Sequence, residues 1–270
     1  MDHGKVCVTG TSGFLASWLI KRLLLAGYHV IGTVRDPGVR ERLHLVKDEL
    51  TEGGSFDNAI MGCEGVFHTA SPVIRGPPFD PRGEILKPAI DGTLNMLRSC
   101  KKNPSLRRVA FTSSSSTLRV RDDFDPNKVT IDESSWSSVE FCERLNIWYV
   151  LSKTMAEKAA WEFCNQNGIN LVTILPSFVV GPSLLPTLCS TASDILGLLQ
   201  GISTVIDNDE LVSILSERYP TLPIPKRFEQ HDRPYYKFDT TKLKSLGFKF
   251  KPIFWFEAKL KPGATSTTKV

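Results

Sequence analysis

The chain has 270 residues, of which 41 % are hydrophobic, so it can bury the core of one large domain or of a domain with a smaller lobe. The net charge is +4 and no basic run is interleaved with aromatic residues, which argues against a nucleic-acid partner. No apolar stretch reaches the roughly 18 residues of a membrane span, so we expect a cytoplasmic protein without one. Six scattered cysteines without a C-x-x-C pair favour reduced thiols over disulfides or a metal site.

Apolar, β-prone runs alternate with helical patterns from the N-terminus to about residue 180. The runs predict strands at 5–10, 28–35, 42–49, 65–71, 107–114 and 170–177. Helices are expected at 14–27, 84–102 and 148–167, and further along at 190–201, 207–219 and 239–247. Strands that alternate with helices are typical of a parallel sheet covered on both faces. The sequence therefore predicts an α/β fold with a doubly wound, Rossmann-type parallel sheet.

A glycine-rich turn joins the first strand to the first helix. Gly10, Gly13 and Ala16 form the pattern G-x-x-G-x-x-A. Small residues let the backbone approach a pyrophosphate, and the helix N-terminus offers it free N–H groups. An ordinary tight turn could also contain these residues, but the strand before it and the helix after it favour a dinucleotide site.

The second strand ends at Arg35, where an acidic residue would bind the ribose 2′-hydroxyl of NAD. An arginine at this position can instead pair with the 2′-phosphate of NADP. The neighbouring Asp36 leaves a solvated surface arginine as the alternative. The cofactor that the sequence favours is NADP.

Tyr149 and Lys153 are four residues apart in a predicted helix and therefore share one face of it. Ser114 lies at the end of the predicted strand 107–114. Hydride addition to a carbonyl leaves negative charge on oxygen, which a tyrosine hydroxyl can neutralise when an ammonium is nearby. A Tyr-x-x-x-Lys pair also arises by chance, but the glycine turn upstream makes a nicotinamide-dependent reductase the favoured interpretation.

Several segments resemble the extended short-chain dehydrogenase/reductase family, namely "VTGTSGFLASWLIKRLL", "GTVRDP", "GVFHTASPV", "TSSSS", "YVLSKTMAE" and "LPSFVVGPS". They are similar to its plant branch of dihydroflavonol, cinnamoyl-CoA and phenylacetaldehyde reductases. "NAIMGCEGVFHTASPV", "RSCKKNPSLRRV" and "LPIPKRFE" further resemble the tetraketide α-pyrone reductases, which reduce polyketide pyrones for pollen-wall sporopollenin. The cinnamoyl-CoA reductase signature N-W-Y-C-Y-G-K reads "NIWYVLSK" here, which disfavours a CoA thioester without excluding it.

The resemblance implies a role for each matching residue. Ser114, Tyr149 and Lys153 match the catalytic triad of the family, and Tyr149 and Lys153 also contact the cofactor. The remaining cofactor contacts would be Gly10, Gly13, Phe14 and Ala16 at the pyrophosphate, Arg35 at the 2′-phosphate, Thr69, Ala70 and Ser71 after the fourth strand, and Pro176 and Ser177 beside the nicotinamide. Glu49 takes the place of the acid that contacts the adenine, with Asp48 as the alternative.

Two segments of these relatives are missing from the chain. Only "DPGVRE" separates the second predicted strand from the third, whereas parallel neighbours need a crossover of about a dozen residues or more. Either the third strand pairs differently, or a strained and uncovered loop makes the connection. The second gap follows Gly201, where relatives continue with a strand and a helix, so the substrate lobe is expected to be truncated.

We therefore expect an NADP-binding Rossmann domain at 1–180, a truncated substrate lobe at 181–255 and a disordered tail at 256–270. The expected activity is NADPH-dependent reduction of a small-molecule ketone or aldehyde, such as a tetraketide pyrone or a dihydroflavonol, by a monomer or homodimer. A catalytically impaired isoform and a nucleotide-sugar epimerase or dehydratase with the same fold are the alternatives.

Overall fold

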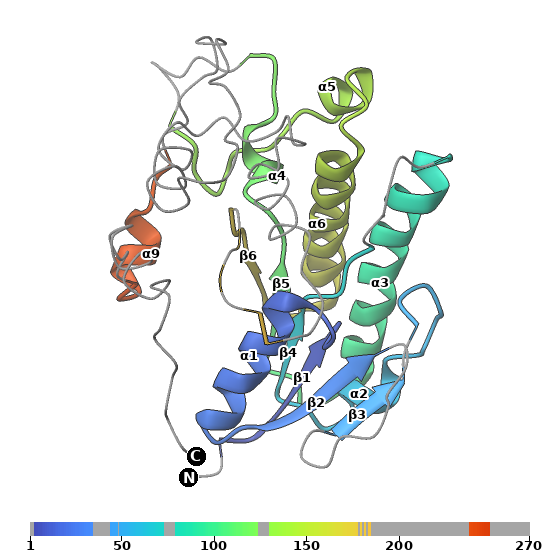
Figure 1. The fold of residues 1–270 in the computed structure, drawn as a ribbon, viewed down its shortest axis with the longest axis vertical. Helices are drawn as coiled ribbons and strands as arrows, with labels where there is room; N and C mark the ends of the chain where they lie inside the picture. The colour runs from blue at the N-terminus through green and yellow to red at the C-terminus, as the bar shows by residue number, and fades with distance from the viewer. Residues whose placement is uncertain are drawn as a thin grey trace, which may run out of the picture.

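A single parallel sheet organises the part of the chain that the computed structural model describes, which comprises residues 3–34, 44–47, 49–72, 79–123, 130–177, 179, 181, 183–184 and 238–248. The strands are β1 (Lys5–Thr9), β2 (His29–Val34), β3 (His44–Lys47), β4 (Gly65–His68), β5 (Arg108–Thr112) and β6 (Leu171–Ile174). They lie in the order β3-β2-β1-β4-β5-β6, and every pairing is parallel (Figure 1). The predicted Rossmann-type sheet is confirmed. Because β1 lies between β2 and β4, the strand order reverses there, where doubly wound sheets bind their ligands.

Helices cover both faces of the sheet. α1 (Phe14–Leu25) covers one face, and α3 (Lys87–Lys102) and α6 (Trp148–Asn167) lie side by side on the other (Figure 1). The shorter elements are α2 (Asp57–Ile60), the π-helical turn η1 (Arg82–Leu86), α4 (Ser116–Arg119), α5 (Val139–Arg144) and α9 (Thr241–Ser245). The long predicted helices are confirmed, whereas those predicted at 190–201 and 207–219 lie outside the described residues.

Side chains of the strands alternate between two apolar layers, as the period of two in a strand requires. Val6, Val8 and Val30 pack with Ala16 and Ile20 of α1. The intervening strand residues, including Cys7, Ile31, Val66, Val109 and Phe111, pack under α2, α3 and α6. Burial on both faces explains why the strands are nearly continuous apolar runs in the sequence.

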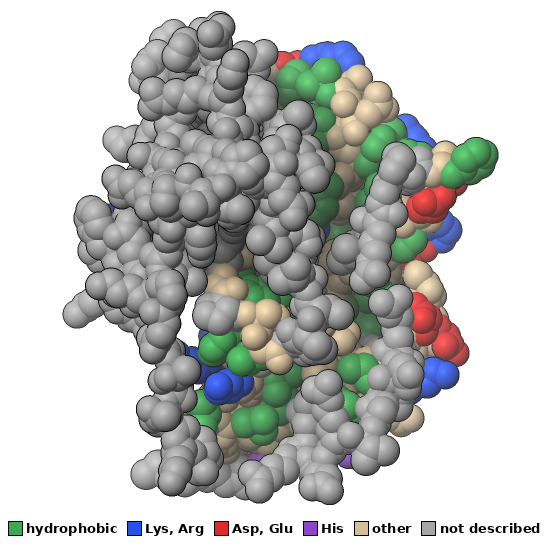
Figure 2. Space-filling view, in the orientation of Figure 1, with side chains coloured by type: hydrophobic (Ala, Val, Ile, Leu, Met, Phe, Trp, Pro, Cys, Tyr) green, Lys and Arg blue, Asp and Glu red, His purple; other side chains and the backbone are tan. Residues whose placement is uncertain are grey.

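The outer surface of α3 shows how the helices separate core from solvent. Its buried side contributes Met96, Leu97 and Cys100 to the core, while Lys87 and Asp91 form an exposed ion pair one turn apart. Figure 2 shows Lys, Arg, Asp and Glu side chains along the side of the molecule on which α3 lies. The charged side of α3 therefore faces water, and its apolar side anchors it to the sheet.

The third strand pairs with the second in parallel, with Ile31 opposite His44 and Val34 opposite Lys47. The alternative that the third strand pairs differently is thereby excluded, and the connection spans residues 35–43, which lie outside the described residues. The side chains of β3 are exposed or only half-buried, unlike those of β1 and β2. That difference fits a strand at the edge of the sheet.

Two further properties concern only the described part of the chain. None of its helices combines the length and the apolar character that are needed to span a lipid bilayer. No three of its His, Cys, Asp and Glu side chains are grouped closely enough to hold a metal ion. Its five cysteines are buried and form no disulfide, and Cys189 lies outside the described residues.

Candidate active site

The glycine turn lies between the end of β1 and the start of α1, at the point where the strand order reverses. Gly10 has a φ of +69°, and a Cβ atom there would lie 2.8 Å from the Cα of Ala70. Glycine is thus required both by the backbone conformation and by the close approach of the loop after β4. Gly13 caps α1 without a side-chain hydrogen bond, and the buried Ala16 packs the first turn of the helix against the sheet.

These features fit a dinucleotide. The first turn of α1 has no acidic residue and no side-chain cap, so its N–H groups and its positive dipole end suit a pyrophosphate. Phe14 is the first residue of that helix, the position at which it could contact the pyrophosphate. The structure therefore places the predicted residues Gly10, Gly13, Phe14 and Ala16 together.

A hydrogen-bond network ties the turn to the loop after β4. The Thr9 hydroxyl accepts the backbone N–H groups of Thr69 and Ala70, both at 3.2 Å, and lies 2.8 Å from Nδ1 of His68. The Thr69 hydroxyl donates to the Thr9 carbonyl at 2.6 Å. Because the Thr9 oxygen already accepts two bonds, its proton goes to Nδ1, which leaves the His68 proton on Nε2. Thr69 and Ala70 are thus fixed beside the glycine turn, and Ser71 follows them directly.

His68 is completely buried and remains neutral. Burial, and to a smaller extent the positive charge of Lys153, lowers the pKa of His68 to about 3. The ring stacks on Phe111, with centroids 5.6 Å apart, and meets the edge of Phe56. Its Nε2 has no hydrogen-bond partner among the described residues. No acidic side chain of the described elements acts on this ring, so burial and Lys153 together favour its neutral form.

Lys153 connects α6 to the end of β5. Its side chain is buried, and Nζ donates to the carbonyl oxygen of Thr112, the last residue of β5, at 2.9 Å. Burial lowers the pKa of Lys153 to about 8, although the Glu157 carboxylate raises it in part. Tyr149 lies one turn earlier on the same helix and is 57 % exposed. The helix therefore presents a buried ammonium and an accessible phenol at the carboxyl edge of the sheet.

Ser114 lies two residues after the end of β5 and thus after the Thr112 carbonyl that binds Lys153. Its hydroxyl oxygen accepts the N–H of Ser116 at 3.2 Å and lies 2.9 Å from the Ser116 hydroxyl. When Ser116 is the donor in both contacts, the proton of Ser114 remains for a substrate oxygen. Ser114, Tyr149 and Lys153 are therefore carried by two elements that meet at one edge of the sheet.

The remaining predicted residues occupy the same edge or lie outside the described residues. The Pro176 carbonyl accepts the N–H of Ser115 at 3.0 Å, which holds the segment Pro176–Ser177 beside the serine loop. Glu49 is exposed and lies just beyond β3. Arg35 lies outside the described residues, and so does Asp48. Thr9, His68 and Glu157 could not be singled out from the sequence, because nothing in their local pattern distinguishes them from ordinary strand or helix residues.

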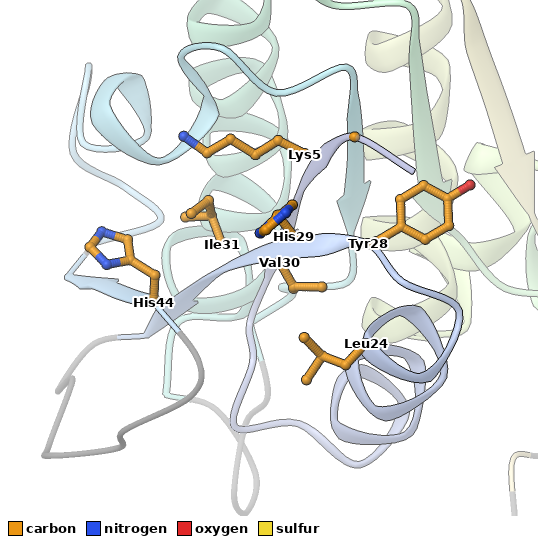
Figure 3. A pocket seen from close by; sticks show the side chains of 8 residues that line it. Lys5, Leu24, Tyr28, His29, Val30, Ile31 and His44 are labelled. Atoms are coloured by element: carbon orange, nitrogen blue, oxygen red, sulfur yellow. The ribbon is translucent and has the colours of Figure 1, made fainter. Parts of the chain in front are cut away.

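An open hollow of about 430 Å³ lies at the opposite edge of the sheet. Its lining includes Lys5, His29 and His44, the first residues of β1, β2 and β3, together with Tyr28 and Leu24 (Figure 3). Parallel strands place their first residues at the edge farthest from their carboxyl ends. The hollow is therefore separate from the glycine turn and from Lys153.

The sequence shares extensive similarity with known reductases. Tetraketide alpha-pyrone reductase 1 of Arabidopsis thaliana is 58 % identical over 93 % of this chain and 92 % of its own length. Vestitone reductase from alfalfa is 32 % identical, with a TM-score of 0.73 over 92 % of this chain and 94 % of that structure. The yeast methylglyoxal/isovaleraldehyde reductase Gre2, solved with NADPH, is 25 % identical, with a TM-score of 0.75 over 95 % of this chain and all of that one.

The alignment with the Arabidopsis reductase also measures what this chain lacks. It spans 301 positions, and 93 % of a chain of 270 residues is about 251, so about 50 positions face no residue here. This difference agrees with the internal omissions that the sequence predicts.

The sequence model of the NAD dependent epimerase/dehydratase family matches residues 6–195, which include the glycine turn, Ser114, Tyr149 and Lys153. The chain therefore belongs to the NAD dependent epimerase/dehydratase family, and it is one of the reductases of that family.

Proposed function

We propose that the chain is an NADPH-dependent carbonyl reductase whose substrate is a tetraketide α-pyrone or a related polyketide or phenolic ketone. The observation that carries the reaction type is the buried Lys153, which is held against the end of β5 one helical turn from the accessible Tyr149. The substrate class is supported by the 58 % identity with the Arabidopsis tetraketide alpha-pyrone reductase.

In this proposal the nicotinamide supplies a hydride to the carbonyl carbon when the cofactor is bound. The Ser114 hydroxyl donates to the carbonyl oxygen and holds it, and the Tyr149 hydroxyl delivers the proton that this oxygen gains. Lys153 uses one of its three N–H donors on Thr112, which leaves two for the phenol and a ribose hydroxyl. In this proposal the ammonium, one helical turn from Tyr149, faces the negative charge that develops on the tyrosine oxygen and so stabilises proton release.

The preference for NADPH rests on Arg35, the residue that follows β2 in the sequence, since dinucleotide-binding folds recognise the ribose with a residue at the end of this strand. The yeast relative was solved with NADPH. Replacing Arg35 by alanine should reduce the preference for NADPH over NADH in kcat/KM by about tenfold to a hundredfold, because one charge-assisted contact is lost. An unchanged preference would remove Arg35 from the cofactor site.

We assign cofactor binding to residues 1–180 and substrate selection to 181–255, with a tail at 256–270, in a monomer or homodimer. Buried cysteines that form no disulfide among the described residues favour a reducing compartment, in agreement with a cytoplasmic location.

The decisive experiment mixes the purified chain with NADPH and a tetraketide α-pyrone, or with a dihydroflavonol, and follows the absorbance of NADPH. Oxidation of one NADPH for each alcohol formed is the expected result. A tightly retained cofactor without net oxidation would instead favour an epimerase or dehydratase.

A second candidate is an isoform that binds NADPH but does not turn over. The specific observation in its favour is the absence of about 50 positions of the Arabidopsis reductase. NADPH binding seen by fluorescence titration, without oxidation in the presence of any ketone tested, would select this candidate.

A further inference from the structure

Glu157 is a buried carboxylate one helical turn beyond Lys153. It is 3 % exposed, and it is the only buried Asp or Glu side chain in the part of the chain that the structure describes. A carboxylate leaves water only at a cost, unless hydrogen bonds and a nearby opposite charge replace its hydration. A buried carboxylate on the helix that bears Tyr149 and Lys153 therefore calls for an explanation.

Both partners of Glu157 belong to residues 113–117, the segment that carries Ser114 and leads into α4, which we call the Ser114 loop. The Ser113 hydroxyl donates to Oε2 of Glu157 at 2.5 Å, and the Thr117 hydroxyl lies 3.0 Å from the same oxygen. Thr117 also lies 2.9 Å from the carbonyl oxygen of Ser114. The carboxylate thus contacts the loop on both sides of Ser114, just before it and three residues after it.

We propose that Glu157 is a positioning residue, whose carboxylate fixes the Ser114 loop against the helix that carries Tyr149 and Lys153. The proposal rests on the proposed reductase function. Two attachments join α6 to residues 112–117: Lys153 Nζ to the Thr112 carbonyl, and Glu157 to the two hydroxyls. They are about 6 Å apart along the helix axis. One attachment alone would allow the loop to turn about it, whereas two fix its orientation.

The spacing of the catalytic groups depends on this arrangement, because Ser114 is on the loop while Tyr149 and Lys153 are on the helix. Displacement of a reacting group by about 1 Å can cost about a hundredfold in rate. Loss of the Glu157 attachment should therefore lower kcat. It should leave the affinity for NADPH in place, since the glycine turn is held by a separate network through Thr9.

Glu157 also acts on Lys153 through its charge. The groups that face Lys153 from the described elements are Glu157 on its own helix, His68 on β4 and the Thr112 carbonyl on β5. Of these, Glu157 raises the pKa of Lys153, against the effect of burial. Neutralising Glu157 should lower the pKa of Lys153 further, so the ammonium is lost at a lower pH.

The test compares Glu157→Gln with Glu162→Gln, which changes an exposed glutamate on the same helix. For Glu157→Gln we expect kcat to fall about tenfold to a hundredfold with KM for NADPH unchanged, and the alkaline fall of kcat to move to lower pH. Glu162→Gln should match the wild-type protein. A uniform loss across pH that parallels a loss of folded protein would show a merely structural role and overturn the proposal, and unchanged kinetics would overturn it as well.

Ser113→Ala provides a milder variant, which by itself should lower kcat in the same direction if Glu157→Gln folds poorly. It removes one donor to Glu157, and its effect on kcat should be less than additive with that of Glu157→Gln, because Ser113→Ala deletes the contact that Glu157→Gln weakens by removing the carboxylate charge. Full additivity in this double-mutant cycle would overturn the proposal.

A readout without substrate separates this proposal from the proposed function. The amides of Thr117 and Leu118 donate to the carbonyls of Ser114 and Ser115, so their hydrogen exchange reports the loop. Exchange at both should be faster in Glu157→Gln, while Ile169, which closes the far end of α6, should be unchanged. If the wild-type protein reduces no ketone, the proposed function fails, and this exchange measurement alone decides whether Glu157 positions the loop. Unchanged exchange at Thr117 and Leu118 would overturn the positioning role.

Discussion

Replacing His68 by asparagine should flatten the fall in stability that the protein undergoes between pH 7.5 and pH 5. His68 is completely buried, and its pKa is lowered to about 3 from the ordinary value of 6.5. In the unfolded chain the imidazole takes up a proton below pH 6.5, but in the folded protein it does not. The neutral ring therefore contributes stability that is fully present above pH 6.5 and is lost as the pH falls towards 3.

The size of the effect follows from the two pKa values. Each pH unit below the pKa of the unfolded histidine costs the folded state about 1.36 kcal/mol of stability. Because pH 5 lies about 1.5 units below that pKa, the loss at pH 5 is about 2 kcal/mol. His68 needs no correction for solvent screening, because it is not exposed. The ordinary pKa of an aspartate, about 3.9, lies below this window, so carboxylates contribute little between pH 7.5 and pH 5.

Urea unfolding followed by circular dichroism at both pH values measures this difference. The side-chain oxygen of asparagine can accept the Thr9 hydroxyl in place of Nδ1, but the amide takes up no proton. The quantity compared is the difference in the free energy of unfolding between pH 7.5 and pH 5. A loss of stability that the His68→Asn substitution causes equally at both pH values does not affect this difference. His44→Gln, at an exposed histidine on β3, should keep the wild-type change. Equal changes in the wild-type protein and in His68→Asn would refute the reasoning.

Three further predictions concern the site and the core. Tyr149→Phe should lower turnover by about 10²–10⁴ while NADPH binding in a fluorescence titration is kept, and unchanged turnover would exclude Tyr149 as the proton donor. Gly10→Ala should lower the free energy of unfolding by about 2–5 kcal/mol, because its Cβ would meet Ala70 at a positive φ, whereas Gly53→Ala, which meets open space, should change it by less than about 0.5 kcal/mol in urea titrations. Burial raises the pKa of Cys164 to about 11, so iodoacetamide at pH 8 should label it only after unfolding, as mass spectrometry would show; rapid labelling of the native protein would contradict its burial.

The strands could be predicted from the sequence because both faces of the sheet are buried, which makes each one an apolar run. Their ends were predicted too long. The run 65–71 ends as a strand at His68, since the next two backbone N–H groups turn to the Thr9 hydroxyl. The run 170–177 ends at Ile174, and Pro176 has no N–H to donate to a ladder.

The helices α2, α4 and α5 were not predicted, because elements of four to six residues are too short to establish a helical period. The glycine turn and the Tyr149–Lys153 pair could be proposed from the sequence because their spacing is combined with the order of strand and helix that a dinucleotide site needs. Glu157 was not, since a glutamate on a helix usually faces water, and only the packing of α6 against the serine loop buries it.

The central position of β1 has a consequence for biosynthesis. β1 leaves the ribosome first, yet one of its two neighbours, β4, lies some sixty residues later, and the far strand β6 is made only after α6. Parallel strands that are far apart in the sequence assemble slowly, because the chain loses the entropy of closing long loops before the hydrogen bonds between the strands can stabilise it. The apolar side chains of β1 that pack under α3 and α6 therefore stay exposed to water while translation continues. We expect the nascent chain to depend on chaperones during that interval.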